Sequence, residues 1–101
     1  MQTIGHFING ELIVDDSPTQ PVYNPSTGEV SKQVAIGGAK TIDDAVAAAK
    51  AAFPDWRKTP PLKRARIMFK FKELLERDWD SLARLIVEEH GKVYSDACGE
   101  L

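Results

Sequence analysis

The sequence contains few of the residues that most often carry chemistry. It has 101 residues and a single cysteine, Cys98, so an intrachain disulfide bond is excluded, which suits a reducing compartment. The only two histidines, His6 and His90, lie far apart in the sequence and show no spacing typical of metal ligands. We therefore expect neither a disulfide-stabilised fold nor a metal site.

Long apolar runs and a strong net charge are also missing. No run approaches the roughly 20 apolar residues of a membrane-spanning helix, and residues 1–5 lack the basic flank and apolar core of a signal peptide. The net charge of −2 favours no strongly charged partner, and the composition, 43% hydrophobic and 28% charged, is that of a globular domain. We expect no membrane partner and a cytoplasmic protein, or one of the mitochondrial matrix in a eukaryote.

The first part of the chain predicts short strands joined by turns. Asn9-Gly10 lies between two apolar runs, and this dipeptide favours a type I′ hairpin because both central residues need a positive φ. Residues 24–28 read Asn-Pro-Ser-Thr-Gly, which is typical of a tight turn. We predict a hairpin of residues 6–8 with 11–14, a loop over 15–21, and a strand pair of residues 22–24 with 29–36.

A helix is predicted to follow Gly37-Gly38. Thr41 is placed to cap it, with Asp44 three residues later in a variant of the capping box. Pro54 is expected to end this helix, because proline lacks the N–H that a helix interior needs. The apolar face combines alanines with larger residues: Ile42, Ala45, Val46, Ala49, Ala52 and Phe53.

Residues 60–101 carry the longest helical pattern. Pro60-Pro61 is typical of a first helical turn, with Thr59 placed to cap it from outside. A second start is predicted at Asp78, and Gly91 suits the position that ends this helix. Residues 95–97 begin another helix only one turn before the chain stops at Leu101, so we expect a truncated protein. The predicted class is α+β: a hairpin, a strand pair, three helices and an unfinished fourth.

None of the possible catalytic groups has the neighbours that its chemistry requires. Cys98 has acids on both sides, which oppose thiolate formation, so we interpret it as a bystander rather than a nucleophile. Glu88 and Glu89 are adjacent and point in different directions on a helix. Ser95 has no accompanying triad signature. We predict no catalytic, cofactor-binding or metal-binding residue in this chain.

A basic cluster precedes an acidic one between residues 57 and 80. It fits either a nucleic-acid patch or the solvated face of an amphipathic helix, and we favour the second because no aromatic, glycine-rich or zinc motif accompanies the charges. The basic residues are Arg57, Lys58, Lys63, Arg64, Arg66, Lys70 and Lys72; the acidic ones are Glu73, Glu76, Asp78 and Asp80.

Taken in order, these segments resemble the N-terminal segment of the aldehyde dehydrogenase superfamily. The matching positions are residues 7–10, 23–30, 44–53, Trp56, Arg64, 74–76 and 89–92. Within the superfamily, residues 88–92, 95–97 and 99–100 are similar to the CoA-acylating methylmalonate-semialdehyde dehydrogenases, as are 53–54, Trp56 and 59–66. Tyr94 and Cys98 depart slightly from that branch, which often has leucine at both positions.

The resemblance implies that residues 1–101 are the N-terminal part of the NAD-binding domain of an α/β aldehyde dehydrogenase fold. The parent enzyme would use NAD and coenzyme A to oxidise methylmalonate or malonate semialdehyde to propionyl-CoA or acetyl-CoA, and would be a homotetramer. Its catalytic cysteine and nucleotide contacts would lie beyond residue 101, so we expect this piece to be inactive and to bind neither cofactor. Some relatives hold a monovalent cation near the positions of Tyr23 and Glu89, although an ordinary turn and a surface acid explain these residues equally.

Two other functions remain open. The chain fits a free-standing protein-interaction module derived from such an enzyme, or, less well, a nucleic-acid-binding protein. Alone it should expose apolar helix faces, so its expected partners are the remainder of the parent chain or copies of itself.

Overall fold

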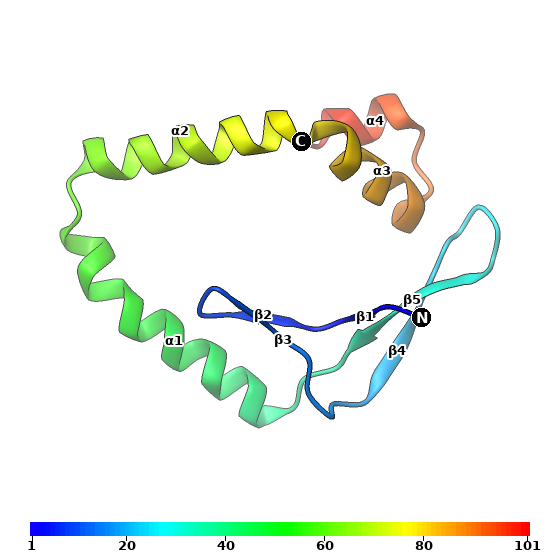
Figure 1. Ribbon diagram of the computed structural model, residues 1–101, viewed down its shortest axis with the longest axis horizontal. Helices are drawn as coiled ribbons and strands as arrows, with labels where there is room; N and C mark the ends of the chain where they lie inside the picture. The colour runs from blue at the N-terminus through cyan, green and yellow to red at the C-terminus, as the bar shows by residue number, and fades with distance from the viewer. The chain divides into compact units, whose positions relative to one another are not determined.

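The structure, a computed structural model, describes all of residues 1–101 and divides them into two units. The first unit contains Met1–Tyr23 and Val30–Lys58, and the second contains Asn24–Glu29 and Thr59–Leu101. The strands and the first helix belong to the first unit, and the other three helices belong to the second (Figure 1). This mixed content confirms the predicted α+β class.

The first unit holds two small sheets. A three-stranded sheet has the order β1-β5-β4, in which β1 runs parallel and β4 antiparallel to the central strand β5. A separate antiparallel hairpin pairs β2 with β3. The strands are β1 (Thr3–Ile4), β2 (His6–Ile8), β3 (Glu11–Ile13), β4 (Thr19–Tyr23) and β5 (Val30–Ala35).

The hairpin forms as predicted. Asn9 has φ 53° and Gly10 has φ 77°, so both central residues adopt the left-handed conformation of a type I′ turn. His6 pairs with Ile13 and Ile8 with Glu11, which places the turn at the expected dipeptide. The strand pair on either side of residues 24–28 is also confirmed, as β4 and β5.

Two strand predictions were wrong. The predicted loop over 15–21 ends earlier, because β4 begins at Thr19 and runs through Pro21. Proline is tolerated there because β4 is an edge strand and needs no N–H on its open side. The two-residue strand β1 was not predicted, because its parallel pairing with β5 joins residues about 30 positions apart and leaves no local pattern.

The helix α1 (Ala39–Lys58) is longer than predicted at both ends. The N–H of Ile42 donates to the carbonyl of Gly38 at 3.2 Å, so Thr41 lies inside the first turn and does not cap the helix. The helix also continues through Pro54 instead of ending there. Proline removes one backbone hydrogen bond, whereas Arg57 and Lys58 in the last turn favour continuation because cations stabilise a helix C-terminus.

The second unit contains α2 (Pro61–Arg77), α3 (Trp79–His90) and α4 (Tyr94–Gly99). The predicted break at Asp78 and the end of α3 at Gly91, with φ 78°, are confirmed. The predicted side-chain caps of α2 and α3 are not confirmed, because no side chain at either N-cap position forms a capping hydrogen bond. Asp78 instead accepts two hydrogen bonds from Arg77, at 2.8 and 2.9 Å.

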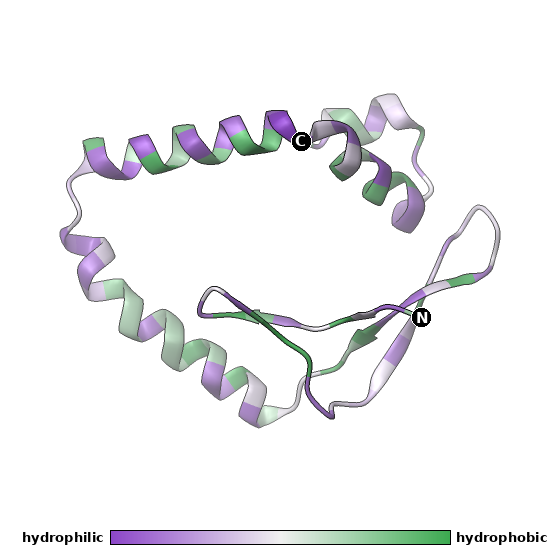
Figure 2. Ribbon diagram, viewed as in Figure 1, coloured by the Kyte–Doolittle hydropathy of each residue, from purple (hydrophilic) through white to green (hydrophobic).

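Few side chains are buried. Ala83 on α3 and Ala97 on α4 are fully buried where these helices pack, because small residues let the backbones approach closely, and Ala35 on β5 is 8% exposed. Apolar and polar residues alternate along α2 (Figure 2). Its large apolar residues remain substantially exposed: Leu62, Ile67, Met68, Phe69, Phe71 and Leu74.

Candidate functional site

A groove in the second unit is formed by α3, α4 and the turn at residues 24–28. Its volume is about 660 Å³, and it is lined by Asn24, Ser26, Asp80, Arg84, Val87, Glu88 and Tyr94. The α3 residues recur about one turn apart, so they share one side of that helix. The groove therefore brings several ionisable side chains together in the second unit.

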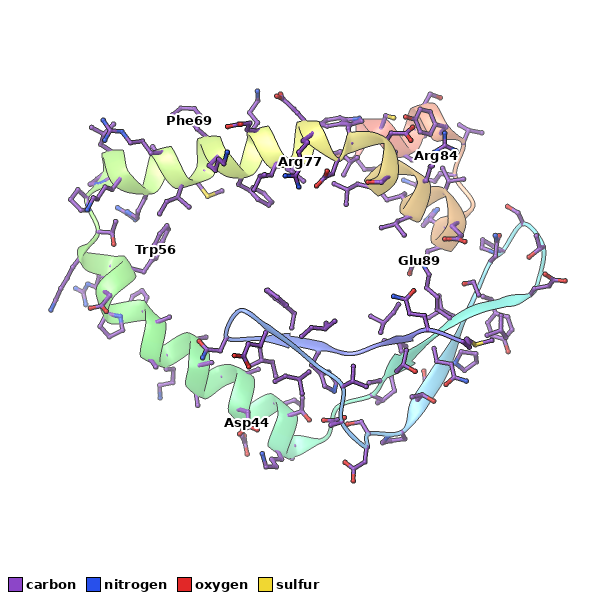
Figure 3. All side chains as sticks on the ribbon, viewed as in Figure 1. Asp44, Trp56, Phe69, Arg77, Arg84 and Glu89 are labelled. Atoms are coloured by element: carbon purple, nitrogen blue, oxygen red, sulfur yellow. The ribbon has the colours of Figure 1, made fainter.

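Asp80 is the centre of a hydrogen-bonded group in this groove. Its Oδ1 accepts a hydrogen bond from the Tyr94 hydroxyl at 2.8 Å, and its Oδ2 accepts one from Nε of Arg84 at 2.9 Å. The Arg84 guanidinium also lies 5.8 Å from the centroid of the Tyr94 ring, within cation–π range. Figure 3 shows Arg84 on α3 beside α4. These contacts tie α4 to α3.

The charges of the group are mutually compensated. The hydrogen bond from Arg84, and then that from Tyr94, lowers the pKa of Asp80, while the hydrogen bond to Asp80 raises the pKa of Arg84. The hydrogen bond to Asp80, followed by the contact with Cys98, raises the pKa of Tyr94 to about 12. At neutral pH the group is therefore a carboxylate, a guanidinium and a neutral phenol, joined by the two hydrogen bonds to Asp80.

The turn beside the groove is held by its own hydrogen bonds. Asn24 Oδ1 accepts from the Ser26 N–H at 2.9 Å, and the Asn24 carbonyl accepts from the Gly28 N–H at 2.8 Å. The end of α3 packs directly on this turn. Gly91 lies so close to Pro25 that a Cβ added to Gly91 would be 2.9 Å from the Cγ atom of Pro25. The Asn-Pro-Ser-Thr-Gly sequence therefore builds one wall of the groove.

Cys98 lies on α4, half-buried, with the Tyr94 hydroxyl as its neighbour. The Tyr94 hydroxyl donates its hydrogen bond to the Asp80 carboxylate, so the thiol's hydroxyl neighbour is itself engaged with an acid. Lys92, just before α4, forms an ion pair with Glu100, just after it. The interpretation of Cys98 as a bystander stays a prediction.

The remaining candidates are dispersed. His6 lies in the first unit, where its Nε2 is buried 3.7 Å from the Asp15 carboxylate, and His90 ends α3 in the second. Glu88 lines the groove, whereas Glu89 is exposed (Figure 3). Tyr23 ends β4 in the first unit, so a cation site involving Tyr23 and Glu89 stays a prediction. Ser95 is exposed on α4. No three His, Cys, Asp or Glu residues are grouped as metal ligands.

The basic cluster is interleaved with acids. Lys70 pairs with Glu73 at 3.3 Å and Lys72 with Glu76 at 2.7 Å along α2, while Arg57 and Lys58 belong to the end of α1. Such neutralised, exposed pairs favour the interpretation as a solvated helix face. In addition, no helix is both long and apolar enough to cross a membrane.

Sequence reasoning did not identify the group around Asp80. Asp80 and Arg84 have the spacing of an i,i+4 ion pair, so the contact between these two residues could have been predicted from the sequence. The Tyr94 contact joins residues 14 positions apart across a helix boundary and carries no local signal.

The sequence profile of the aldehyde dehydrogenase family matches residues 13–101. The chain therefore belongs to the aldehyde dehydrogenase family, and its fold matches the N-terminal part of solved structures in that family. Among curated relatives, the malonate-semialdehyde dehydrogenase of Pseudomonas aeruginosa is 50% identical over 101 residues, covering 100% of this chain and 20% of that enzyme. The chain thus spans about a fifth of the length of the relatives it matches.

Two solved structures are particularly similar. The methylmalonate-semialdehyde dehydrogenase of Oceanimonas doudoroffii superposes with a TM-score of 0.96 at 57% identity, over 99% of this chain and 20% of that one. A Sinorhizobium meliloti protein described as a methylmalonate-semialdehyde dehydrogenase, solved with NAD, gives a TM-score of 0.95 at 40% identity, over 99% and 21% of the two chains. These relatives support the predicted branch as well as the family.

Proposed function

We propose that residues 1–101 form the N-terminal part of the NAD-binding domain of an NAD-dependent, CoA-acylating malonate- or methylmalonate-semialdehyde dehydrogenase. The observation that carries this proposal is the identity of 50% to a malonate-semialdehyde dehydrogenase and of 57% to a methylmalonate-semialdehyde dehydrogenase, across essentially the whole chain. The presence of NAD in the Sinorhizobium meliloti structure supports NAD as the oxidant.

Within such an enzyme this segment acts as scaffold. In the complete enzyme, a cysteine thiolate would add to the aldehyde carbon and NAD would accept the hydride. The substrate carboxylate would leave as CO2, and the thiol of coenzyme A would take the remaining acyl group and release the cysteine. The groups available here do not fit the nucleophile or the base of that sequence, because Asp80 and Arg84 neutralise each other and Tyr94 stays protonated. The isolated chain is therefore inactive and binds neither cofactor.

A chimeric enzyme tests the proposal. The matching N-terminal fifth of the Pseudomonas aeruginosa enzyme is replaced by residues 1–101, and NADH formation from malonate semialdehyde is measured with and without coenzyme A. We expect acyl-CoA and NADH to form together, because the segment supplies the same packing surfaces. A control chimera takes the corresponding segment of the moss aldehyde dehydrogenase 21, which is 28% identical to this chain, and should be less active.

A chimera that folds and assembles but forms no NADH, or one no better than the control, would refute the assignment to this branch. The parent enzyme is further proposed to be a cytoplasmic homotetramer, or a matrix enzyme in a eukaryote. Sedimentation of the active chimera measures its assembly directly.

The second candidate is a protein-interaction module. The exposed apolar residues of α1 and α2 favour it, since Phe53 is 57% exposed and Phe69 is 69% exposed. It differs from the first candidate in requiring a stable complex of the 101-residue chain itself, which a sizing measurement of the purified chain detects.

A further inference from the structure

His6 places an unpaired polar atom inside the first unit. Its side chain is 15% exposed, and its Nε2 atom is buried without a hydrogen-bond partner. The ring lies against the segment that follows β5, since a Cβ added to Gly37 would be 3.1 Å from the Cε1 atom of His6. The other residues that line the hollow beside His6 are all uncharged, and most are apolar. A buried polar atom without a partner costs free energy, so this site accommodates the neutral ring poorly.

Asp15 is the acid that lies beside this buried atom. Its Oδ1 atom is 3.7 Å from Nε2 of His6, which is too far for a hydrogen bond but within the range of an ion pair if the ring is protonated. The same Oδ1 atom accepts a hydrogen bond from the Ser17 N–H at 2.9 Å, so the carboxylate is held in place. Lys40 also acts on Asp15 electrostatically, but its ammonium group pairs with Asp44 at 2.7 Å. A small side-chain movement would therefore join His6 to Asp15.

Only one member of this pair changes its charge near neutral pH. The hydrogen bonds from Ser17, and then the nearby His6, lower the pKa of Asp15 below its ordinary value, so Asp15 is a carboxylate in weak acid as well as at neutral pH. Histidine is the side chain that ordinarily gains or loses its charge between about pH 5 and 8. A change of pH in this range therefore changes the attraction between the two side chains.

We propose that protonation of His6 closes its contact with Asp15 and makes this contact a pH-sensitive tie at the base of the β2–β3 hairpin. The protonated Nε2 donates to the carboxylate, which gives the buried nitrogen a partner and balances the new charge. The burial of the ring opposes its charge, and the fixed carboxylate offsets that cost.

The tie connects the two sheets of the first unit. Asp15 lies in the segment that joins β3 to β4 (Figure 1), and the Pro18 carbonyl of this segment accepts a hydrogen bond from the Ile36 N–H at 2.8 Å, just after β5. A closed contact between His6 and Asp15 therefore holds the hairpin to the three-stranded sheet more firmly in weak acid. This inference concerns residues of the first unit alone and does not depend on the proposed enzymatic function.

A double-mutant cycle at two pH values tests the contact. His6→Gln keeps a polar side chain that cannot become charged, and Asp15→Asn keeps an oxygen that accepts from the Ser17 N–H. Urea unfolding of the 101-residue chain and its variants gives the coupling between the two substitutions. We expect the coupling to change the unfolding equilibrium constant about two- to fivefold at about pH 5.5, and not to change it at about pH 8.

Asp16 provides the matched control for this cycle. Asp16→Asn removes the same charge one residue later, so it should show no coupling with His6→Gln at either pH. Three results would overturn the proposal: a coupling between His6 and Asp15 of equal size at both pH values, a larger coupling at the higher pH, or no coupling at either.

Nuclear magnetic resonance of the unmodified chain gives a second test that requires no stable variant. The side-chain carboxyl carbon signal of Asp15 should shift between about pH 8 and 5.5 as His6 gains its proton, whereas that of Asp16 should stay nearly constant. An Asp15 signal that stays as constant as that of Asp16 through this range would show that the two side chains do not interact, and would refute the pH-sensitive tie.

Discussion

Replacing Gly91 with alanine tests how the end of α3 is joined to the turn at residues 24–28. Gly91 has φ 78°, and a left-handed conformation costs an L-residue roughly 1–2 kcal/mol. A Cβ at this position would also lie 2.9 Å from Cγ of Pro25, closer than packed carbon atoms approach. Relieving such an overlap costs about 1–3 kcal/mol more, so Gly91→Ala should lower the free energy of unfolding by about 2–4 kcal/mol.

A second glycine provides the matched control. Gly28 has φ 75°, but nothing lies within 4 Å of its Cβ position, so Gly28→Ala should show the backbone cost alone, about 1–2 kcal/mol. Urea unfolding followed by far-UV circular dichroism measures both variants. Adding Pro25→Ala to Gly91→Ala removes the overlapping Cγ atom and should recover part of the extra loss.

Equal destabilisation by the two glycine variants would show that α3 does not pack on the Pro25 turn. The same conclusion would follow if Pro25→Ala gave no recovery in the Gly91→Ala background, because the two substitutions would then act independently. Either result would contradict the assignment of the turn at residues 24–28 as one wall of the groove.

Two further predictions concern Tyr94 and Pro54. Because the pKa of Tyr94 is raised from 10.0 to about 12, the hydrogen bond of its protonated hydroxyl stabilises the fold fully below pH 10, and this stabilisation is lost as the pH rises towards 12. Ultraviolet titration should show a tyrosine midpoint near 12. This midpoint should be absent from Tyr94→Phe and should shift towards 10 in Asp80→Asn. An unchanged midpoint in Asp80→Asn would contradict the hydrogen bond between these residues. Pro54→Ala should restore a backbone hydrogen-bond donor inside α1, and should raise both the helix content and the free energy of unfolding, the latter by at most about 3 kcal/mol. Circular dichroism and urea unfolding measure these two quantities. No change in either would indicate that the helix accommodates Pro54 without loss of stability.

The local signals in the sequence predicted every helix and every strand except β1, but not the limits of α1 and β4. Asn9-Gly10, the turn ending at Gly28 and the break at Asp78 were all predicted, because each depends on φ preferences of one or two residues. The end of α1 was mispredicted because the cost of a single proline is smaller than the stabilisation from the helical residues on either side of it. Strand β1 depends on pairing with distant β5, which no local pattern encodes.

The groove was predictable only in part for the same reason. The Asp80–Arg84 pair follows from helical spacing, but Tyr94 reaches Asp80 only once α4 has packed on α3 through the buried Ala83 and Ala97. The family assignment did not need this geometry, since it followed from the order of short motifs along the whole chain, and the profile match to residues 13–101 confirms it.

The most direct test of the central claim is an NADH assay of the 101-residue chain alone, with malonate semialdehyde, NAD and coenzyme A. If this segment has the proposed role of scaffold without a catalytic nucleophile, no NADH should form beyond the uncatalysed rate, either in repeated turnover or in a single-turnover burst. NADH formation by the isolated chain that disappears in Cys98→Ser would contradict the account and make Cys98 a nucleophile.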